Sequence, residues 1–271
     1  MSSRIHPTAV VDRTAELAAD VEVGPAAVVG PGVRIGEGTR VGAGAQLEGP
    51  TVLGPGNRVF PHACIGFEPQ DLKFSGEETR LEVGARNTFR EFCTVHRGTG
   101  KGGALTTIGD DNLFMVYTHV AHDCHVGNRT IFSNGGTLAG HVRVEDDAVI
   151  GAYSAVHQFC RVGRHAYIGG YSKIVQDPLP YAKSVGDKAC FYGMNRIGLE
   201  RKGMDAATLE RIERALRIVV RGPRKLEEAL QQVRTELGGH PEVDYLVDFV
   251  EGSERGVIRN LPLRRGRGQG D

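Results

Sequence analysis

Apolar side chains recur at every sixth position over most of this chain. The series runs from Ile5 to Ile65, resumes at Val83, breaks once more, and continues from Ile108 to Ile174. A period of six fits neither an amphipathic helix, with a period of 3.6, nor a half-buried strand, with a period of 2. It is typical of short strands joined by turns. Three such hexapeptides would close one triangular coil of 18 residues.

A second column of small residues stands two positions before the apolar one. It includes three of the five cysteines, Cys93, Cys124 and Cys160, which we expect to be buried filler. A narrow prism has room for one large side chain per face in each coil, so its neighbour must be small. Glycine often follows the apolar residue, as at Gly36 and Gly42, and we expect it to relax the backbone at or near each corner.

These columns predict a mainly β fold in which each coil pairs with the next to form a parallel β-helix. Coils stack about 4.8 Å apart, so eight to nine coils would give a prism on the order of 40 Å long. Two interruptions, at residues 66–82 and 97–107, are polar and contain glycine. Each is either a loop at a binding face or an insertion tolerated on the surface.

A helical pattern replaces the repeat near the C-terminus. Apolar residues at helical spacing predict helices over 205–220 and 225–237 and a third that begins at Pro241. Asp205 is the expected N-cap of the first. We therefore expect a β-helix domain over residues 1–190 and a helical domain over 191–260 that covers the open end of the prism. A disordered tail is expected over 261–271.

Composition narrows the class of protein. The chain has 33 acidic and 33 basic residues, so its formal charge is zero, which argues against a nucleic-acid coat. It has no CxxC motif, no apolar segment typical of a secretory signal, and no apolar run of about 18 residues. We expect a reduced, soluble, cytoplasmic protein that binds no nucleic acid and does not insert stably into a membrane.

Candidate chemistry is concentrated between residues 118 and 159. With 18 residues per coil, His122, Gly140 and Gln158 form one vertical column, and Asp123 and His141 form the adjacent one. Stacked imidazoles could hold a zinc ion with an open position, as in a carbonic-anhydrase-type enzyme. Alternatively, one imidazole could act as a general base with a carboxylate that orients it. The spacing alone leaves both chemistries open.

The repeat resembles the left-handed parallel β-helix of the hexapeptide-repeat acyltransferases. At higher resolution, the chain resembles the acyl-[acyl-carrier-protein]–UDP-N-acetylglucosamine O-acyltransferases that begin lipid A synthesis, from residue 4 to about residue 258. The motifs that carry this resemblance, in order, are HPTA (6–9), QDLK (70–73), HRGT (96–99), AHDC (121–124), LAGH (138–141), AVHQF (155–159) and GxN (193–195).

The resemblance implies transfer of an (R)-3-hydroxyacyl chain from acyl carrier protein to the glucosamine 3-hydroxyl of UDP-N-acetylglucosamine, without a metal or other cofactor. It also implies a homotrimer with the site between adjacent subunits. An acceptor with a 3-amino group would need the same base, so the 3-amino analogue of the sugar nucleotide stays open as an alternative.

The same resemblance assigns roles to individual residues. His122 would be the general base, Asp123 its partner, and the backbone N–H of Gly140 the oxyanion donor. Gly170 matches the position that limits acyl-chain length and suggests a long chain. Substrate contacts would come from Asp71, Lys73, His119, His141, His157, Gln158, Asn195, Glu200, Arg201 and Lys202. Lys202 stands where the family often has a second arginine, so it keeps the charge without the bidentate fork.

Overall fold

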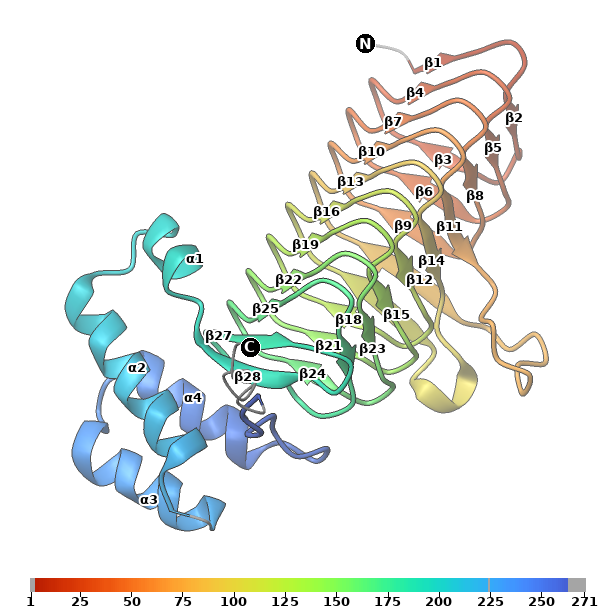
Figure 1. The fold of residues 1–271 in the computed structure, drawn as a ribbon. Coiled ribbons are helices and arrows are strands. Elements are labelled where there is room, and N and C mark those ends of the chain that lie inside the picture. The colour runs from red at the N-terminus through yellow and green to blue at the C-terminus, as the bar shows by residue number, and fades with distance from the viewer. Residues whose placement is uncertain (1–2, 224, 263–271) are drawn as a thin grey trace, which may run out of the picture.

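The computed structural model describes residues 3–223 and 225–262. Its larger part is a left-handed parallel β-helix, a triangular prism with one sheet on each face (Figure 1). The predicted fold class is therefore confirmed.

The first face is sheet A. Its strands are β1 (Arg4–Ile5), β4 (Glu22–Val23), β7 (Arg40–Val41), β10 (Arg58–Val59), β13 (Thr88–Phe89), β16 (Leu113–Phe114), β19 (Ile131–Phe132), β22 (Val149–Ile150), β25 (Tyr167–Ile168), β27 (Ala182–Val185) and β28 (Cys190–Met194). The other two faces are sheets B and C. Sheet B contains β2 (Val10–Val11), β5 (Val28–Val29), β8 (Gln46–Leu47), β11 (Cys64–Phe67), β14 (Thr94–His96), β17 (His119–Val120), β20 (Thr137–Leu138), β23 (Ala155–Val156) and β26 (Lys173–Ile174). Sheet C contains β3 (Glu16–Leu17), β6 (Val33–Ile35), β9 (Thr51–Leu53), β12 (Arg80–Val83), β15 (Leu105–Ile108), β18 (His125–Val126), β21 (Arg143–Val144) and β24 (Arg161–Val162).

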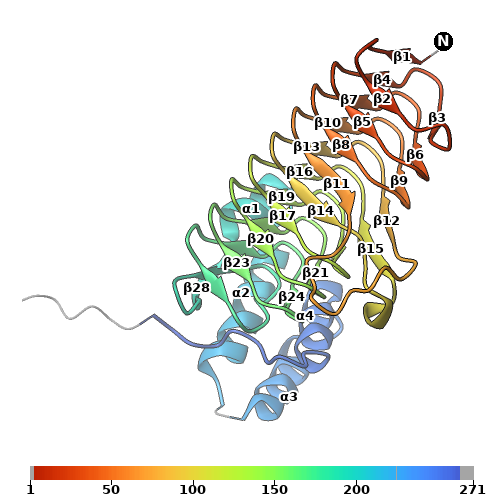
Figure 2. The same ribbon diagram turned by 90° about the vertical axis from the view of Figure 1, so that its right-hand side faces the viewer.

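The register follows the predicted 18-residue coil. His119 pairs with Thr137, for example, and His125 with Arg143. Both interruptions leave the columns intact, because Val83 pairs with Ile108 across the second one. Each interruption joins a strand of sheet B to the next strand of sheet C, so both loops emerge at the same corner of the prism (Figure 2).

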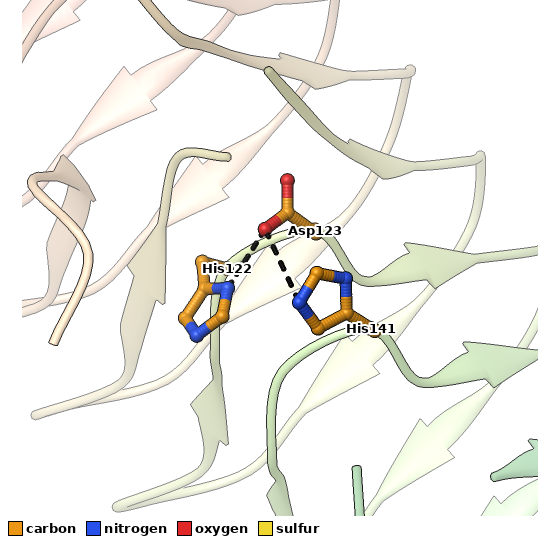
Figure 3. Close-up of side chains that lie close together, drawn as sticks. All are labelled: His122, Asp123 and His141. Atoms are coloured by element: carbon orange, nitrogen blue, oxygen red, sulfur yellow. Dashed lines mark hydrogen bonds and ion pairs between the residues drawn. The ribbon is translucent and has the colours of Figure 1, made fainter. Parts of the chain in front are cut away.

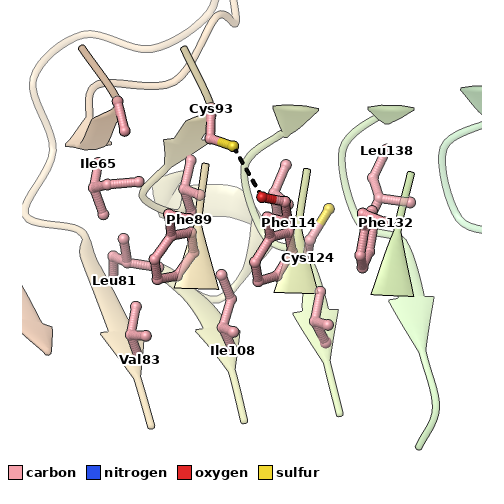
Figure 4. Close-up of a cluster of buried hydrophobic side chains, with 14 of the residues drawn as sticks. Ile65, Leu81, Val83, Phe89, Cys93, Ile108, Phe114, Cys124, Phe132 and Leu138 are labelled. Atoms are coloured by element: carbon pink, nitrogen blue, oxygen red, sulfur yellow. Dashed lines mark hydrogen bonds between the residues drawn. The ribbon is translucent and has the colours of Figure 1, made fainter. Parts of the chain in front are cut away.

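The apolar column fills the prism, as predicted. Phe89, Phe114 and Phe132 stack in the interior with ring centroids 4.9 and 4.8 Å apart (Figure 4). Removing one such side chain from water contributes about 1.5–3 kcal/mol. The small column is buried beside it, and Cys93 and Cys124 are free and buried there. Burial raises the pKa of the Cys124 thiol to about 12, so it stays protonated filler.

The glycines after the apolar positions have a different role from the expected one. Gly36 and Gly42 have ordinary backbone angles, but an added Cβ would meet the next coil's backbone at 2.6 and 2.8 Å. They are needed for close stacking of coils rather than for a special backbone conformation. The left-handed conformation falls two residues later, where side chains such as Asp123 (φ 57°) and His141 (φ 62°) also adopt it.

Helices lie at the C-terminal end of the prism (Figure 1). The three predicted helices are confirmed as α2 (Ala206–Arg221), α3 (Leu226–Leu237) and α4 (Pro241–Glu251). Asp205 caps α2, since its side chain accepts from the Thr208 N–H. A short helix, α1 (Arg196–Arg201), and the antiparallel pair β27–β28 were not predicted, because they carry no clear periodicity. The division at residue 190 stays a prediction, and residues 263–271 of the expected tail lie outside the described residues.

Two arginines fasten α4 to the prism. The guanidinium of Arg161 lies 3.9 Å from the Phe249 ring centroid, and that of Arg164 lies 4.1 Å from the Tyr245 ring centroid. Arg164 also pairs with Glu242. Among residues 3–223 and 225–262, no helix is both long and apolar enough to cross a membrane.

Candidate functional site

The stacked columns predicted from the 18-residue period exist at the corner between sheets B and C. His122 and Asp123 occupy the turn between β17 and β18, and His141 occupies the turn one coil further on. The His141 N–H donates to the His122 carbonyl at 3.0 Å, which fixes the stacking of the two turns. This corner is also where both interruptions emerge.

His122 and Asp123 form a hydrogen-bonded dyad. His122 Nδ1 donates to Asp123 Oδ2 at 2.8 Å, while His141 Nε2 lies 3.8 Å from the same oxygen (Figure 3). The two imidazoles meet edge to face, with centroids 5.1 Å apart. The second ring nitrogen of His122 points away from the carboxylate (Figure 3). A neutral His122 held in this way has an acceptor nitrogen free to take a proton.

Asp123 is almost completely buried, which the sequence did not predict. Its side chain is 1% exposed, whereas that of His122 is 15% exposed. Burial acts to raise the pKa of the Asp123 carboxyl, but hydrogen bonds from His122 and Thr99 outweigh burial and hold that pKa below its ordinary value. The carboxylate is therefore ionised at neutral pH and can stabilise a protonated imidazole beside it.

Gly140 lies against the His122 ring. An added Cβ would sit 2.5 Å from His122 Cε1 and 2.7 Å from Nε2. Within the described part of the chain, no protein acceptor takes the Gly140 N–H. A free N–H beside the acceptor nitrogen of a base is suited to binding a developing oxyanion.

The donor set fits the dyad better than a zinc site. His122, Asp123 and His141 offer three ligand atoms within 4.8 Å of one another. Two atoms bound to one tetrahedral zinc at about 2.0–2.1 Å would lie roughly 3.3 Å apart. The 2.8 Å separation of His122 Nδ1 and Asp123 Oδ2 is instead a direct hydrogen bond. The zinc-lyase alternative thus finds no support in this geometry.

His119 lies on the outer face of β17, beside the dyad but not in contact with it. Its Nδ1 is hydrogen-bonded to Thr94 Oγ1 at 2.7 Å, and its ring packs edge to face on His96. Burial lowers the pKa of His119 to about 4. His119 is therefore neutral near pH 7 and presents a hydrogen-bonding imidazole rather than a charge.

His157 and Gln158 lie one coil beyond His141 and are exposed. A guanidinium nitrogen of Arg255 donates to His157 Nδ1 at 3.2 Å. The Phe159 ring stacks on His141 with centroids 4.6 Å apart. A polar cavity of about 240 Å³ borders this corner between Asp123 and the segment after α4.

The first interruption brings Asp71 and Lys73 to the same corner. The Asp71 side chain accepts from the Lys73 N–H at 2.9 Å, which stabilises the turn, and Lys73 is exposed. Burial lowers the pKa of His141, and the carboxylates of Asp123 and Asp71 act in the opposite direction. Asp71 therefore contributes to the electrostatic field at the site.

The remaining predicted residues lie on other corners. Lys202 pairs with Asp147 at 2.6 Å, and Asn195 donates to the His165 carbonyl at 3.1 Å. Asp147 and His165 belong to turns between sheets C and A, and Gly170 to a turn between sheets A and B. Glu200 lies 3.7 Å from Arg196 in α1, and Arg201 is exposed there. One chain therefore does not bring these residues together with His122.

Sequence reasoning missed three residues that contact the site: Thr99, Thr106 and Arg255. Thr99 belongs to the HRGT motif, and its hydroxyl and N–H both donate to Asp123. The Thr106 hydroxyl accepts from the Asp123 N–H. All three come from segments outside the regular repeat, so the 18-residue spacing carried no signal for their position.

Known proteins resemble this chain over nearly its full length. A family model described as "Udp N-acetylglucosamine O-acyltransferase; Domain 2" matches residues 177–258. An acyl-[acyl-carrier-protein]–UDP-N-acetylglucosamine O-acyltransferase of Stenotrophomonas maltophilia is 49% identical, covering 94% of this chain and 98% of the relative. A protein of the same name from Verminephrobacter eiseniae is also 49% identical, covering 95% and 100%.

Solved structures agree. The UDP-N-acetylglucosamine acyltransferase of Francisella novicida superposes with a TM-score of 0.92 at 33% identity, covering 94% of each chain. The UDP-N-acetylglucosamine acyltransferase of Bacteroides fragilis superposes with a TM-score of 0.91 at 37% identity, covering 94% of this chain and 99% of that one.

Proposed function

This chain belongs to the family of acyl-[acyl-carrier-protein]–UDP-N-acetylglucosamine O-acyltransferases, and we propose that it catalyses that reaction. It would transfer an (R)-3-hydroxyacyl chain from acyl carrier protein to the glucosamine 3-hydroxyl of UDP-N-acetylglucosamine, the first step of lipid A biosynthesis. The observation that carries the proposal is the His122–Asp123 dyad, with a free imidazole nitrogen beside the Gly140 N–H.

The dyad suggests how the reaction proceeds. His122 takes the proton of the sugar 3-hydroxyl as its oxygen attacks the thioester carbonyl. Asp123 stabilises the imidazolium that forms, and the Gly140 N–H donates to the oxyanion of the tetrahedral intermediate. The carbon–sulfur bond then breaks. His122 returns the proton to the thiolate of the carrier protein, and the ester remains on the sugar.

Other predicted residues fit substrate contacts around this centre. Asp71, Lys73, His119 and His141 would bind the sugar and phosphates, and His157 with Gln158 would lie along the acyl donor. Asn195, Glu200, Arg201 and Lys202 would bind the nucleotide. Because Lys202 already pairs with Asp147, a nucleotide would have to compete with that carboxylate for the ammonium group.

A homotrimer would complete the site. The residues proposed for the nucleotide are in or beside α1, near the corner between sheets C and A, while His122 stands at the corner between sheets B and C. A second copy could place its α1 region beside the first copy's His122. Mixed oligomers test this: His122→Ala and Arg201→Ala chains, each inactive or weakened alone, should regain activity when refolded together. No recovery in verified mixed trimers would contradict a shared site.

Product analysis tests the reaction itself. The purified protein would be incubated with a panel of 3-hydroxyacyl carrier proteins and with either UDP-N-acetylglucosamine or its 3-amino analogue. Mass spectrometry should detect the 3-O-acyl sugar nucleotide, and a dominant amide product would favour the analogue as the natural acceptor. Absence of both products with every donor would refute an acyltransferase.

We place this reaction in the cytoplasm. All five cysteines are free, as expected in a reducing compartment. Fractionation of cells that express the tagged protein would test this location, and recovery from an oxidising compartment would contradict it.

A further inference from the structure

The second interruption of the repeat folds directly over the carboxylate of the dyad. The Thr99 N–H donates to Asp123 Oδ1 at 2.9 Å, and the Thr99 hydroxyl donates to Asp123 Oδ2 at 2.7 Å. From the other end of the loop, Thr106 Oγ1 accepts from the Asp123 N–H at 2.8 Å. Both ends of one insertion are therefore bonded to one residue, and neither bond was predicted from the repeat.

The direction of the Thr99 hydroxyl is fixed by the loop. Its oxygen accepts from the Gly102 N–H at 3.2 Å within the short 3₁₀ turn Gly100–Gly102. The hydroxyl proton is then directed at Asp123 Oδ2, the oxygen that also accepts from His122 Nδ1. A continuous chain of hydrogen bonds thus runs from the loop through Thr99 and Asp123 to His122.

Glycines in the loop make room for this carboxylate. An added Cβ at Gly102 would lie 2.1–2.4 Å from the Asp123 carboxyl atoms, and one at Gly98 would lie 2.8 Å from Asp123 Oδ1. Neither glycine has a positive φ, so the backbone conformation does not require them. Close approach to the carboxylate explains both, and the result is an Asp123 side chain that is 1% exposed.

We propose that Thr99 is a positioning residue for the reaction and that residues 97–107 serve to hold and desolvate Asp123. The inference rests on the proposed function of the dyad. Two donors on a buried carboxylate fix its rotamer, and the carboxylate in turn fixes the tautomer and plane of the His122 ring. Exclusion of water strengthens the attraction between the carboxylate and the imidazolium that forms during proton transfer.

Replacement of the hydroxyl tests this. Thr99→Val keeps the shape and the N–H but removes the hydroxyl donor, so the kcat for acyl transfer should fall about tenfold or more. The KM for UDP-N-acetylglucosamine should stay within about twofold, since Thr99 does not contact the substrate. Thr99→Ser restores the donor and should return kcat to within about threefold of wild type.

The pH profile separates positioning from mere stability. A carboxylate with one donor fewer leaves more negative charge facing His122, so the acid limb of the kcat profile should move to higher pH in Thr99→Val. Thr130→Val is the matched control. It removes another buried threonine hydroxyl, bonded to Asn112 at 2.7 Å on a different corner. It should lower the melting temperature without changing kcat or the acid limb.

The outcomes distinguish this inference from the proposed function. If His122→Ala is inactive while Thr99→Val keeps wild-type kcat and an unmoved acid limb, the role of Thr99 is refuted and the dyad stands. Equal losses in Thr99→Val and Thr99→Ser, together with a lower melting temperature, would also refute it in favour of a structural role. If His122→Ala retains activity, the proposed base itself is wrong.

Discussion

The contact between Gly140 and His122 allows a sharp test by a single methyl group. In Gly140→Ala the new Cβ would lie 2.5 Å from His122 Cε1, whereas ordinary contacts begin at 3.4 Å. The imidazole must therefore move by about 1 Å or tilt away from Asp123, and a displacement of that size in a reacting group costs about 100-fold in rate. This loss corresponds to about 2.7 kcal/mol of transition-state stabilisation.

The fold itself should survive this change. Gly140 does not have a positive φ, and the equivalent positions one coil away carry the side chains of His122 and Gln158. The assay is steady-state acyl transfer with saturating sugar nucleotide, together with a thermal melt. Gly136→Ala, in the same coil, is the control because its Cβ would meet its nearest atoms at 3.1 and 3.3 Å, away from the dyad. A Gly140→Ala kcat within about threefold of wild type would refute the placement of the base.

Three further outcomes follow from the same structure. His122→Ala should lower kcat by about 10²–10⁴-fold with an unchanged melt, and near-normal turnover would contradict its role as base. Gly170→Met should shift preference to shorter acyl donors in a competition assay, and unchanged selectivity would count against a length-limiting role. His119 has a folded-state pKa of about 4 against 6.5 in the unfolded chain, so below pH 6.5 only the unfolded chain binds its proton and folding stability falls toward pH 4. His119→Gln should remove part of that loss, measured as the difference in urea midpoints between pH 7 and pH 5; an equal loss in both proteins would contradict it.

The hexapeptide period was sufficient to predict the prism, its coil of 18 residues and its buried columns. A solenoid contacts only its neighbouring coils, so spacing along the chain converts directly into position in space. That is why the spacing alone predicted that His141 stacks on the His122–Asp123 turn and that Gln158 continues the His122 column. The helices were predictable because amphipathic spacing and caps are also local signals.

Only the tertiary structure decided what lies against these columns. No period relates Thr99 to Asp123, because the loop that joins them leaves the repeat, and the burial of the carboxylate depends on that loop. The structure likewise showed that close coil stacking requires Gly36 and Gly42, and that Lys202 pairs with Asp147. Local periodicity determined where each side chain stands on the prism. Packing of irregular segments against it determined which of those side chains are buried, oriented and charged for chemistry.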